Sequence, residues 1–251
     1  MVIQDLQGRP QEKPRLDREH AFEFSCHPGI PCFTQCCRDI TIVLTPYDVL
    51  RMKRALKISS EEFIDRFTII FPKPKRLIPL VVLKMKEDDK RCPFVSEAGC
   101  AIYEDRPWPC RIYPLNPADD GTYHLITNAS RCKGLNEKKI WKIADWLVDQ
   151  GTEDYDEMNE LLSNITIPLQ ARDLDIDNPR IAQMVFMALY RIDKFRDFVF
   201  QSSFLKRLDV EPERVEKIKK EDIELLKFAF DWIKFGLFGE KLFWVKEHPQ
   251  E

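Results

Sequence analysis

The sequence predicts an α+β protein, with a small irregular cysteine-rich metal-binding region containing short strands and a mostly helical C-terminal part. All eight cysteines lie at or before position 132 of the 251 residues. Residues 1–135 carry a net charge of +3, whereas residues 136–251 carry −6. After Lys133 the pattern changes to long stretches with apolar residues at helical spacing. We therefore expect an N-terminal arm (1–23), a cysteine-cluster metal-binding domain (24–135) and a helical region (136–251).

In the first half, turn residues separate short β-branched and aromatic runs, which predict strands. These runs lie at 40–45, 76–85, 91–95, 99–103 and 123–128. Thr45 followed by Pro46 and Asp48 predicts a helix N-terminus, and Ser59 with Glu62 predicts a second one. Four prolines within EDRPWPCRIYPLNP predict that no regular helix crosses Cys110.

In the second half, apolar periodicity predicts helices at 136–148, 178–208 (one helix or two) and 222–235. We interpret the phenylalanines of this half as helix core rather than as a ligand pocket. They are Phe186, Phe195, Phe198, Phe200 and Phe204. This half should form its own apolar core, so that a 136–251 fragment would be helical and insensitive to chelator.

The N-terminus has charges of both signs and no apolar signal-like stretch. The longest apolar stretch, 77–83, is too short to span a bilayer. We therefore expect a cytoplasmic protein with no membrane association, in which clustered thiols serve metal or redox chemistry; a secreted protein would instead carry four disulfides. The overall charge of −3 does not favour nucleic acid as a partner.

The candidate metal ligands are the eight cysteines: Cys26, Cys32, Cys36, Cys37, Cys92, Cys100, Cys110 and Cys132. Thiolates are soft donors that suit zinc or iron–sulfur clusters, and four complete either kind of site. Eight could serve two four-ligand sites, or one site and a redox pair. Cys36 and Cys37 are adjacent, so their thiols should point in different directions and serve different metal atoms or sites. The alternative for any single cysteine is a small buried hydrophobe.

Several separated blocks resemble one family. F-x-C…C-x3-CC is followed by a T-P-Y-D helix and then by C-P-F-V…G-C-A-I-Y-E-D-R-P-x-x-C-R-I-Y-P. This order resembles the YkgJ-like cysteine-cluster proteins, whose CxxCxxCC domain chelates zinc or iron and also occurs in flagellin lysine-N-methylase. The likeness runs from Phe24 to Leu135, but the first two gaps here are five and three residues rather than two and two.

The leading hypothesis for function is an iron–sulfur cluster held by thiolates. We favour it over zinc because the thiols are numerous and widely spaced, and because Arg38, Arg111 and Arg131 adjoin cysteines. The resemblance implies a second hypothesis: a protein lysine N-methyltransferase that uses S-adenosylmethionine, with no catalytic or cofactor-binding residue assigned. The third is a structural zinc module that serves a partner protein. A protein substrate or partner is expected, and the oligomeric state is left open.

Residues beside the cysteines have two interpretations each. His27 is a surface loop imidazole or a ligand, and we favour the former. Arg106 and Arg111 either face the thiolates or pair with Glu104 and Asp105 to hold the loop. Tyr113 orients the same loop or simply packs. Asp48 complements the dipole of the helix that it begins.

Overall fold

A computed structural model describes residues 14–72, 77–171 and 178–246, and divides the chain into two compact units. Unit 1 comprises the described residues up to Cys36, Ser96–Gly99 and Trp108–Glu153. Unit 2 comprises Cys37–Val95, Cys100–Pro107 and the described residues from Asp154 onward. The expected arm lies outside the described residues as far as residue 13; its later part is structured.

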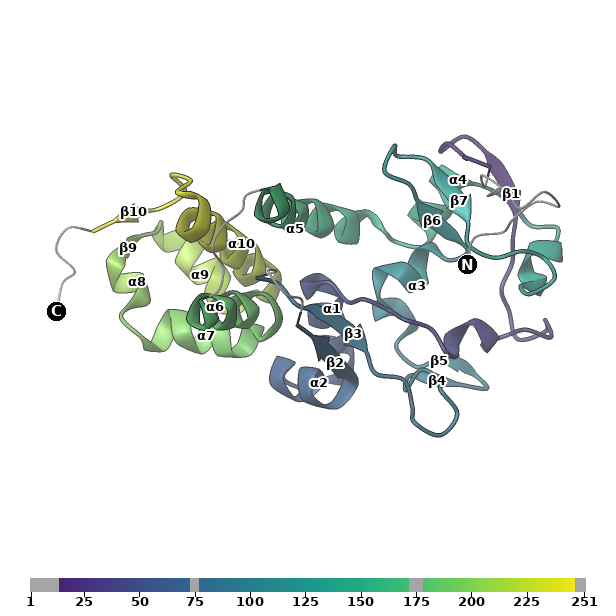
Figure 1. Ribbon diagram of the computed structural model, residues 1–251, viewed down its shortest axis with the longest axis horizontal. Helices are drawn as coiled ribbons and strands as arrows, with labels where there is room; N and C mark the ends of the chain where they lie inside the picture. Colours follow the sequence, from purple (N-terminus) through teal and green to yellow (C-terminus); the bar gives the residue numbers. More distant parts are fainter. Residues whose placement is uncertain (1–13, 73–76, 172–177, 247–251) are drawn as a thin grey trace. The chain divides into compact units, whose positions relative to one another are not determined.

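Unit 1 is built on two short antiparallel strand pairs. β1 (Ala21–Glu23) pairs with β8 (Ile140–Lys142), with Phe22 opposite Trp141. β6 (Leu115–Pro117) pairs with β7 (Tyr123–Leu125), and Leu16 forms a bridge to Tyr123. The helices are α3 (Trp108–Ile112), α4 (Ile143–Asp149) and the 3₁₀ turn η3 (Lys133–Asn136) (Figure 1). The core comprises Phe22, Phe24, Ile112, Leu115, Cys132, Ile143, Trp146 and Leu147.

Two expectations about unit 1 were wrong. A one-turn helix, α3, does cross Cys110, because Pro109 stands in its first turn, where a missing N–H costs no helical hydrogen bond. The helix expected from position 136 begins only at Ile143. Ile140 belongs to β8 and is exposed, because pairing with β1 outweighs the helical spacing of the apolar residues.

The first elements of unit 2 are two capped helices and a ribbon. α1 (Pro46–Leu56) begins with a reciprocal capping box between Thr45 and Asp48, and α2 (Ser60–Phe67) begins with a bond from the Glu62 N–H to Ser59 Oγ. Both helix starts are confirmed. β2 (Thr68–Phe71) pairs antiparallel with β3 (Leu80–Leu83); β2 was not predicted. The strand expected at 40–45 is reduced to a single bridge from Val43 to Val82.

Short turns connect the ribbon to the rest of the chain. A small hairpin of β4 (Val95–Ser96) and β5 (Gly99–Cys100) confirms the two predicted strands there, in shortened form. The 3₁₀ turns η1 (Gln35–Cys37) and η2 (Tyr103–Asp105) complete this part of the chain.

Helices form the rest of unit 2, as predicted in outline (Figure 1). They are α5 (Glu153–Ala171), α6 (Pro179–Tyr190), α7 (Ile192–Gln201), α8 (Phe204–Arg207), α9 (Pro212–Lys220) and α10 (Asp222–Phe238). A two-residue pair, β9 (Leu208–Asp209) with β10 (Trp244–Val245), closes the end. Within the described ranges, no helix has the length and apolar character needed to cross a bilayer.

The helical core of unit 2 is not confined to the C-terminal half. Phe195, Phe228 and Phe230 are almost fully buried there, but so are Met52 of α1 and Phe63 of α2. Helix α10 contacts α1 as well as α6, α7 and α9. The acidic half thus shares its core with residues 46–67, which differs from the expectation that it forms one alone.

A buried cation connects the two parts of this core. Lys53, 7% exposed, bonds Asp193 at 2.9 Å and lies 3.1 Å from Asp222. The Ser60 N–H also donates to Asp193, and Arg196 pairs with Asp222 at 2.5 Å. Because each charge has partners, the network fixes how α1 and α2 meet α7 and α10.

Candidate metal centre

The structure separates the eight thiols into two groups. Unit 1 holds Cys26, Cys32, Cys36, Cys110 and Cys132, whereas unit 2 holds Cys37, Cys92 and Cys100. The boundary falls between the adjacent Cys36 and Cys37. That these two neighbours serve different metal sites stays a prediction.

Cys26, Cys32 and Cys36 lie on a loop wound by consecutive turns. The Ile30 N–H donates to the His27 carbonyl, the Phe33 N–H to Ile30, and the Gln35 N–H to Cys32. Ile30 is buried and anchors the loop. Such winding compensates for the longer gaps between the first cysteines, because turns shorten the distance that an extended chain would span.

Cys132 reaches the same loop from the C-terminal side. Its N–H donates to the Asn128 carbonyl at 2.8 Å, and the Asn128 side chain receives the N–H of Ser130 at 3.1 Å. The Ser25 N–H donates to the Gly134 carbonyl at 3.0 Å. A Cβ at Gly134 would lie 2.7 Å from the Ser25 carbonyl oxygen, so the close approach of these segments requires glycine there.

Two polar groups other than cysteines form hydrogen bonds with the sulfurs of unit 1. The backbone N–H of Lys133 donates to Cys32 Sγ at 3.1 Å, across 101 residues of sequence. The Tyr113 hydroxyl is hydrogen-bonded to Cys132 and to Thr127. Its ring packs against Phe24, with centroids 6.3 Å apart. Tyr113 therefore both packs and contacts a thiol, and it does so through a hydroxyl that sequence spacing alone could not place.

The pKa of Cys26 responds to three other thiols of unit 1. Desolvation of the sulfur comes first, followed by the influence of Cys36, Cys132 and Cys32, and together they raise the pKa of Cys26 to about 11. Burial, the Cys132 bond and the charge of Cys36 raise the pKa of Tyr113. A thiol whose pKa is raised in this way ionises readily only beside a cation. A bound metal ion is such a cation, and it converts thiols to thiolate ligands.

Within residues 14–72, 77–171 and 178–246, no three His, Cys, Asp or Glu side chains are arranged so that they could hold a metal ion. Cys26 and the three thiols that act on it would therefore have to move closer together to share a metal ion. Their chemistry fits the task, because four soft sulfur donors suit both tetrahedral zinc and iron–sulfur clusters. Cys110 stands apart in sequence on α3, half-buried.

In unit 2, Cys92 and Cys100 form a second, smaller group. Burial raises the pKa of Cys92, and Cys100 adds to the shift while Lys86 opposes it. Burial likewise raises the pKa of Cys100, which the guanidinium of Arg106 opposes. The N–H of Cys92 donates to the carbonyl of Cys37 at 2.8 Å, so the backbone of Cys37 lies beside that of Cys92.

The neighbouring charged residues take different roles. Arg106, whose charge opposes the rise in the pKa of Cys100, stacks 3.7 Å above the Tyr103 ring. Arg111 is buried and donates to the Gln150 carbonyl at 2.6 Å, and Arg38 donates to the Asp89 carbonyl at 2.7 Å. These two bonds hold loops, which is the alternative role for arginines that adjoin cysteines. Arg131 is exposed.

The remaining candidates have structural partners. His27 receives the Gly29 N–H at 3.1 Å, and its other ring nitrogen lies 3.4 Å from Glu137, in line with a loop imidazole. Asp105 pairs with Arg51 at 2.7 Å, a partner that was not predicted. Lys86 was not predicted as a neighbour of the thiols. Its charge opposes the rise in the pKa of Cys92, although it lies six residues before that cysteine in the sequence.

The fold and these thiols define a class: a cysteine-rich domain with soft-metal donors in two groups. Comparison with protein families agrees. Residues 25–133 match the family CxxCxxCC, described as "Putative zinc- or iron-chelating domain", so the cysteine-bearing stretch carries this domain. The resemblance seen in the sequence is confirmed, and with it a general metal-binding role. Comparisons with curated proteins and with solved structures return no match.

Proposed function

We propose that this protein binds an iron–sulfur cluster through cysteine thiolates, with Cys26, Cys32, Cys36 and Cys132 as one ligand set. The observation that carries the proposal is the approach of the segment that holds Cys132 to the first cysteine loop, where the Lys133 N–H donates to Cys32 Sγ at 3.1 Å. The action of Cys36, Cys132 and Cys32 on Cys26 supports the same grouping. Cys37, Cys92 and Cys100 are the thiols that unit 2 offers to a second site. A bound cluster would supply electron-transfer or Lewis-acid chemistry.

Hydrogen bonds to sulfur support a site of thiolate ligands in unit 1. Donors directed at thiolates and sulfides stabilise the negative charge of a cluster and tune its potential. The Lys133 N–H to Cys32 and the Tyr113 hydroxyl to Cys132 supply two such contacts in unit 1. The number and spacing of the thiols still favour a cluster. The argument from neighbouring arginines is weaker, because Arg38 and Arg111 donate to backbone carbonyls of loops.

Anaerobic purification of the full chain tests this proposal. We expect brown protein with iron, acid-labile sulfide and visible absorption. Cys132→Ser should remove the absorption that belongs to unit 1, whereas Cys92→Ser should leave it in place. The matched control is Ser130→Ala, which removes a side chain two residues from Cys132 and no thiol. Colourless protein with stoichiometric zinc and no sulfide would contradict the cluster and favour a structural zinc module.

Lysine methylation stays a prediction from the resemblance. Holo-protein incubated with labelled S-adenosylmethionine and candidate proteins would reveal transfer of the methyl group to lysine. The metal analysis and this assay are independent, because a chain can bind a cluster with or without such activity.

A further inference from the structure

The sulfur of Cys32 lies against the backbone of Cys132. The Lys133 N–H donates to Cys32 Sγ at 3.1 Å. Because the Lys133 nitrogen is bonded to the carbonyl carbon of Cys132, Cys32 Sγ lies within one peptide unit of the Cys132 backbone. A disulfide forms only between cysteines whose backbones approach closely, and this contact is such an approach.

Tertiary contacts hold the two segments together. The Ser25 N–H donates to the Gly134 carbonyl at 3.0 Å, and the Phe24 N–H donates to the Lys139 carbonyl at 2.9 Å. Phe24 and Cys132 belong to the same apolar core. The cysteine loop therefore starts on the segment that carries Cys132, and the approach does not depend on a bound metal to bring the two segments together.

The two thiols differ in their access to solvent. Cys32 is half-buried, whereas Cys132 is 7% exposed. A small oxidant from solvent therefore reaches Cys32 before it reaches Cys132. In this arrangement Cys32 is the thiol that is oxidised first, and Cys132 is the thiol that resolves the product.

A disulfide makes a smaller demand on the geometry than the proposed metal site does. It needs two thiols in contact, whereas a zinc ion or a cluster takes four. In the parts of the chain that the structure describes, no three donor side chains are arranged to hold a metal ion. The same sulfurs cannot serve a disulfide and a metal at once, so the two states exclude each other.

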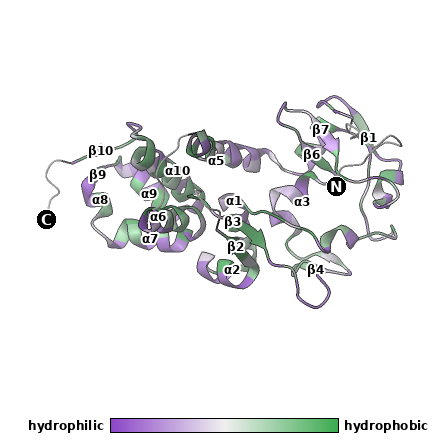
Figure 2. Cartoon of the chain, viewed as in Figure 1, coloured by the Kyte–Doolittle hydropathy of each residue, from purple (hydrophilic) through white to green (hydrophobic). Residues whose placement is uncertain are grey.

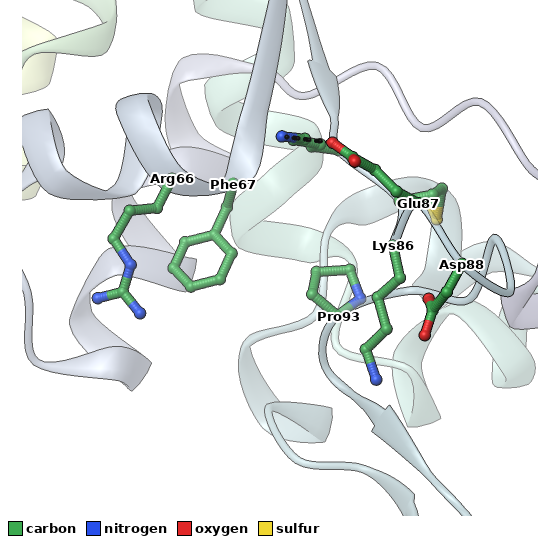
Figure 3. Close-up of a pocket in the computed structure, with 8 residues that line it drawn as sticks. Arg66, Phe67, Lys86, Glu87, Asp88 and Pro93 are labelled. Atoms are coloured by element: carbon green, nitrogen blue, oxygen red, sulfur yellow. Dashed lines mark ion pairs between the residues drawn. The ribbon is translucent and has the colours of Figure 1, made fainter.

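Unit 2 offers an oxidant a different target. An open hollow of about 470 Å³ lies at the ends of β2 and β3, which carry the hydrophobic colour in Figure 2. Its described lining includes side chains of both charges, such as Lys86 and Asp88 (Figure 3), and the thioether of Met85, but no cysteine. Oxidation of Met85 to the sulfoxide therefore reports general oxidation rather than a thiol reaction.

We propose that hydrogen peroxide joins Cys32 to Cys132 in a disulfide, which releases the metal of unit 1. The Cys32 sulfur attacks the peroxide, the O–O bond breaks, and a sulfenic acid and one water form. The Cys132 sulfur then attacks the sulfenic sulfur, the S–S bond forms, and the second water leaves with the thiol proton. The release rests on the proposed function, because both cysteines belong to that ligand set; the disulfide itself does not.

The test exposes full-length protein, both as purified without oxygen and after chelator treatment, to an equimolar amount of hydrogen peroxide. Chymotryptic cleavage after Phe33 and fragment mass spectra identify the linked cysteines. We expect a Cys32–Cys132 link before Met85 sulfoxide appears, metal loss in step with the link, and rebinding of metal after reduction with a dithiol. Cys132→Ser should abolish the link. The matched control, Cys110→Ser, removes a thiol of unit 1 outside the ligand set and should leave the link in place.

A substitution at Lys133 isolates the contact itself. Cys132 is extended, with φ −105° and ψ 103°, as a residue before proline must be, and Lys133 begins η3, where proline fits. Lys133→Pro removes the N–H that holds Cys32 Sγ and should slow formation of the link about tenfold. Lys133→Ala keeps that N–H and loses only the side-chain bond to the Ala129 carbonyl, so it should react as the parent does.

Several results would overturn the disulfide: a link from Cys132 to another cysteine, a link between Cys26 and Cys36 alone, or equal rates in the two Lys133 variants. Should the proline variant fail to fold, the identity of the linked cysteines decides. Metal lost from the parent without the link would overturn the switch and leave the metal proposal standing. Protein that forms the link but holds no metal as purified would contradict the proposed function, and the release with it, while confirming the disulfide.

Discussion

Units 1 and 2 reach their folded states by different means. Unit 2 buries whole phenylalanine and leucine side chains between helices, with Phe195, Leu226 and Phe228 fully enclosed. Unit 1 has strands of three residues, loops joined by backbone hydrogen bonds, and a core that includes Cys132. Apolar burial drives the folding of unit 2, whereas unit 1 has less of it per residue. We infer that thiol chemistry matters to the stability of unit 1 and not to the helical core of unit 2.

The largest expected effect tests the helical core. Phe195→Ala should destabilise unit 2 by about 3–5 kcal/mol, because the ring is enclosed and leaves a cavity. Phe24→Ala in unit 1 should cost less, since the surrounding loops can collapse into the space. Urea titration followed by amide hydrogen exchange, which reports each unit separately, measures both. A larger loss from Phe24→Ala would contradict the comparison.

The same contrast explains what the sequence could predict about the fold. The two helix N-termini that depend on local hydrogen bonds were predicted, because the Thr45 cap and the bond to Ser59 involve residues only three positions away. The strand β8 was not predicted, because its partner β1 is more than a hundred residues distant in sequence. Helix α5 was also not predicted; it contains Pro168 and buries few of its residues.

The sequence predicted the kind of ligand atom in the candidate site, but not which cysteines lie together. Thiol donors and metal binding follow from residue type. The grouping of Cys132 with the first loop depends on the Gly134 approach to Ser25, a tertiary contact. The bond from Arg111 to the Gln150 carbonyl joins residues that are distant in sequence, so its position beside Cys110 could not predict this partner.

A pair of glycine substitutions sharpens the comparison with smaller effects. Gly134→Ala places a Cβ 2.7 Å from a backbone oxygen, and should destabilise unit 1 by about 1–3 kcal/mol and weaken metal retention. Gly236→Ala on α10 meets nothing within 4 Å and should stabilise unit 2 by about 0.5–1 kcal/mol, because alanine favours the helix.

Thermal unfolding and metal content of both glycine variants give the measurement. Retention of metal in Gly134→Ala at the parental level would show that the contact between residues 25 and 134 does not position the thiols.

The smallest expected effect concerns acid. Burial acts to raise the pKa of Asp193, but the Ser60 N–H and the Lys53 ammonium outweigh it and hold the pKa below the ordinary 3.8. In unit 1, bonds from the Thr122 hydroxyl and N–H, with Arg15, hold the pKa of Asp120 below the same value. A carboxyl whose pKa is lowered on folding stabilises the folded state at pH values above its unfolded-state pKa. This stability is lost as the pH falls through the lowered, folded-state pKa. Both contributions should therefore be complete above pH 3.8 and decline below it.

Salt separates the two carboxyls. Asp120 is on the surface, so added salt screens its partner and its contribution should fade. Asp193 faces Lys53, which is 7% exposed, and its contribution should persist in high salt. The measurement is hydrogen exchange of α7 and of β7 between pH 5 and pH 3, at low and at high salt, in parent, Asp193→Asn and Asp120→Asn chains. Equal salt sensitivity of the two elements would mean that water reaches the Lys53 network, and that unit 2 is no better sealed than unit 1.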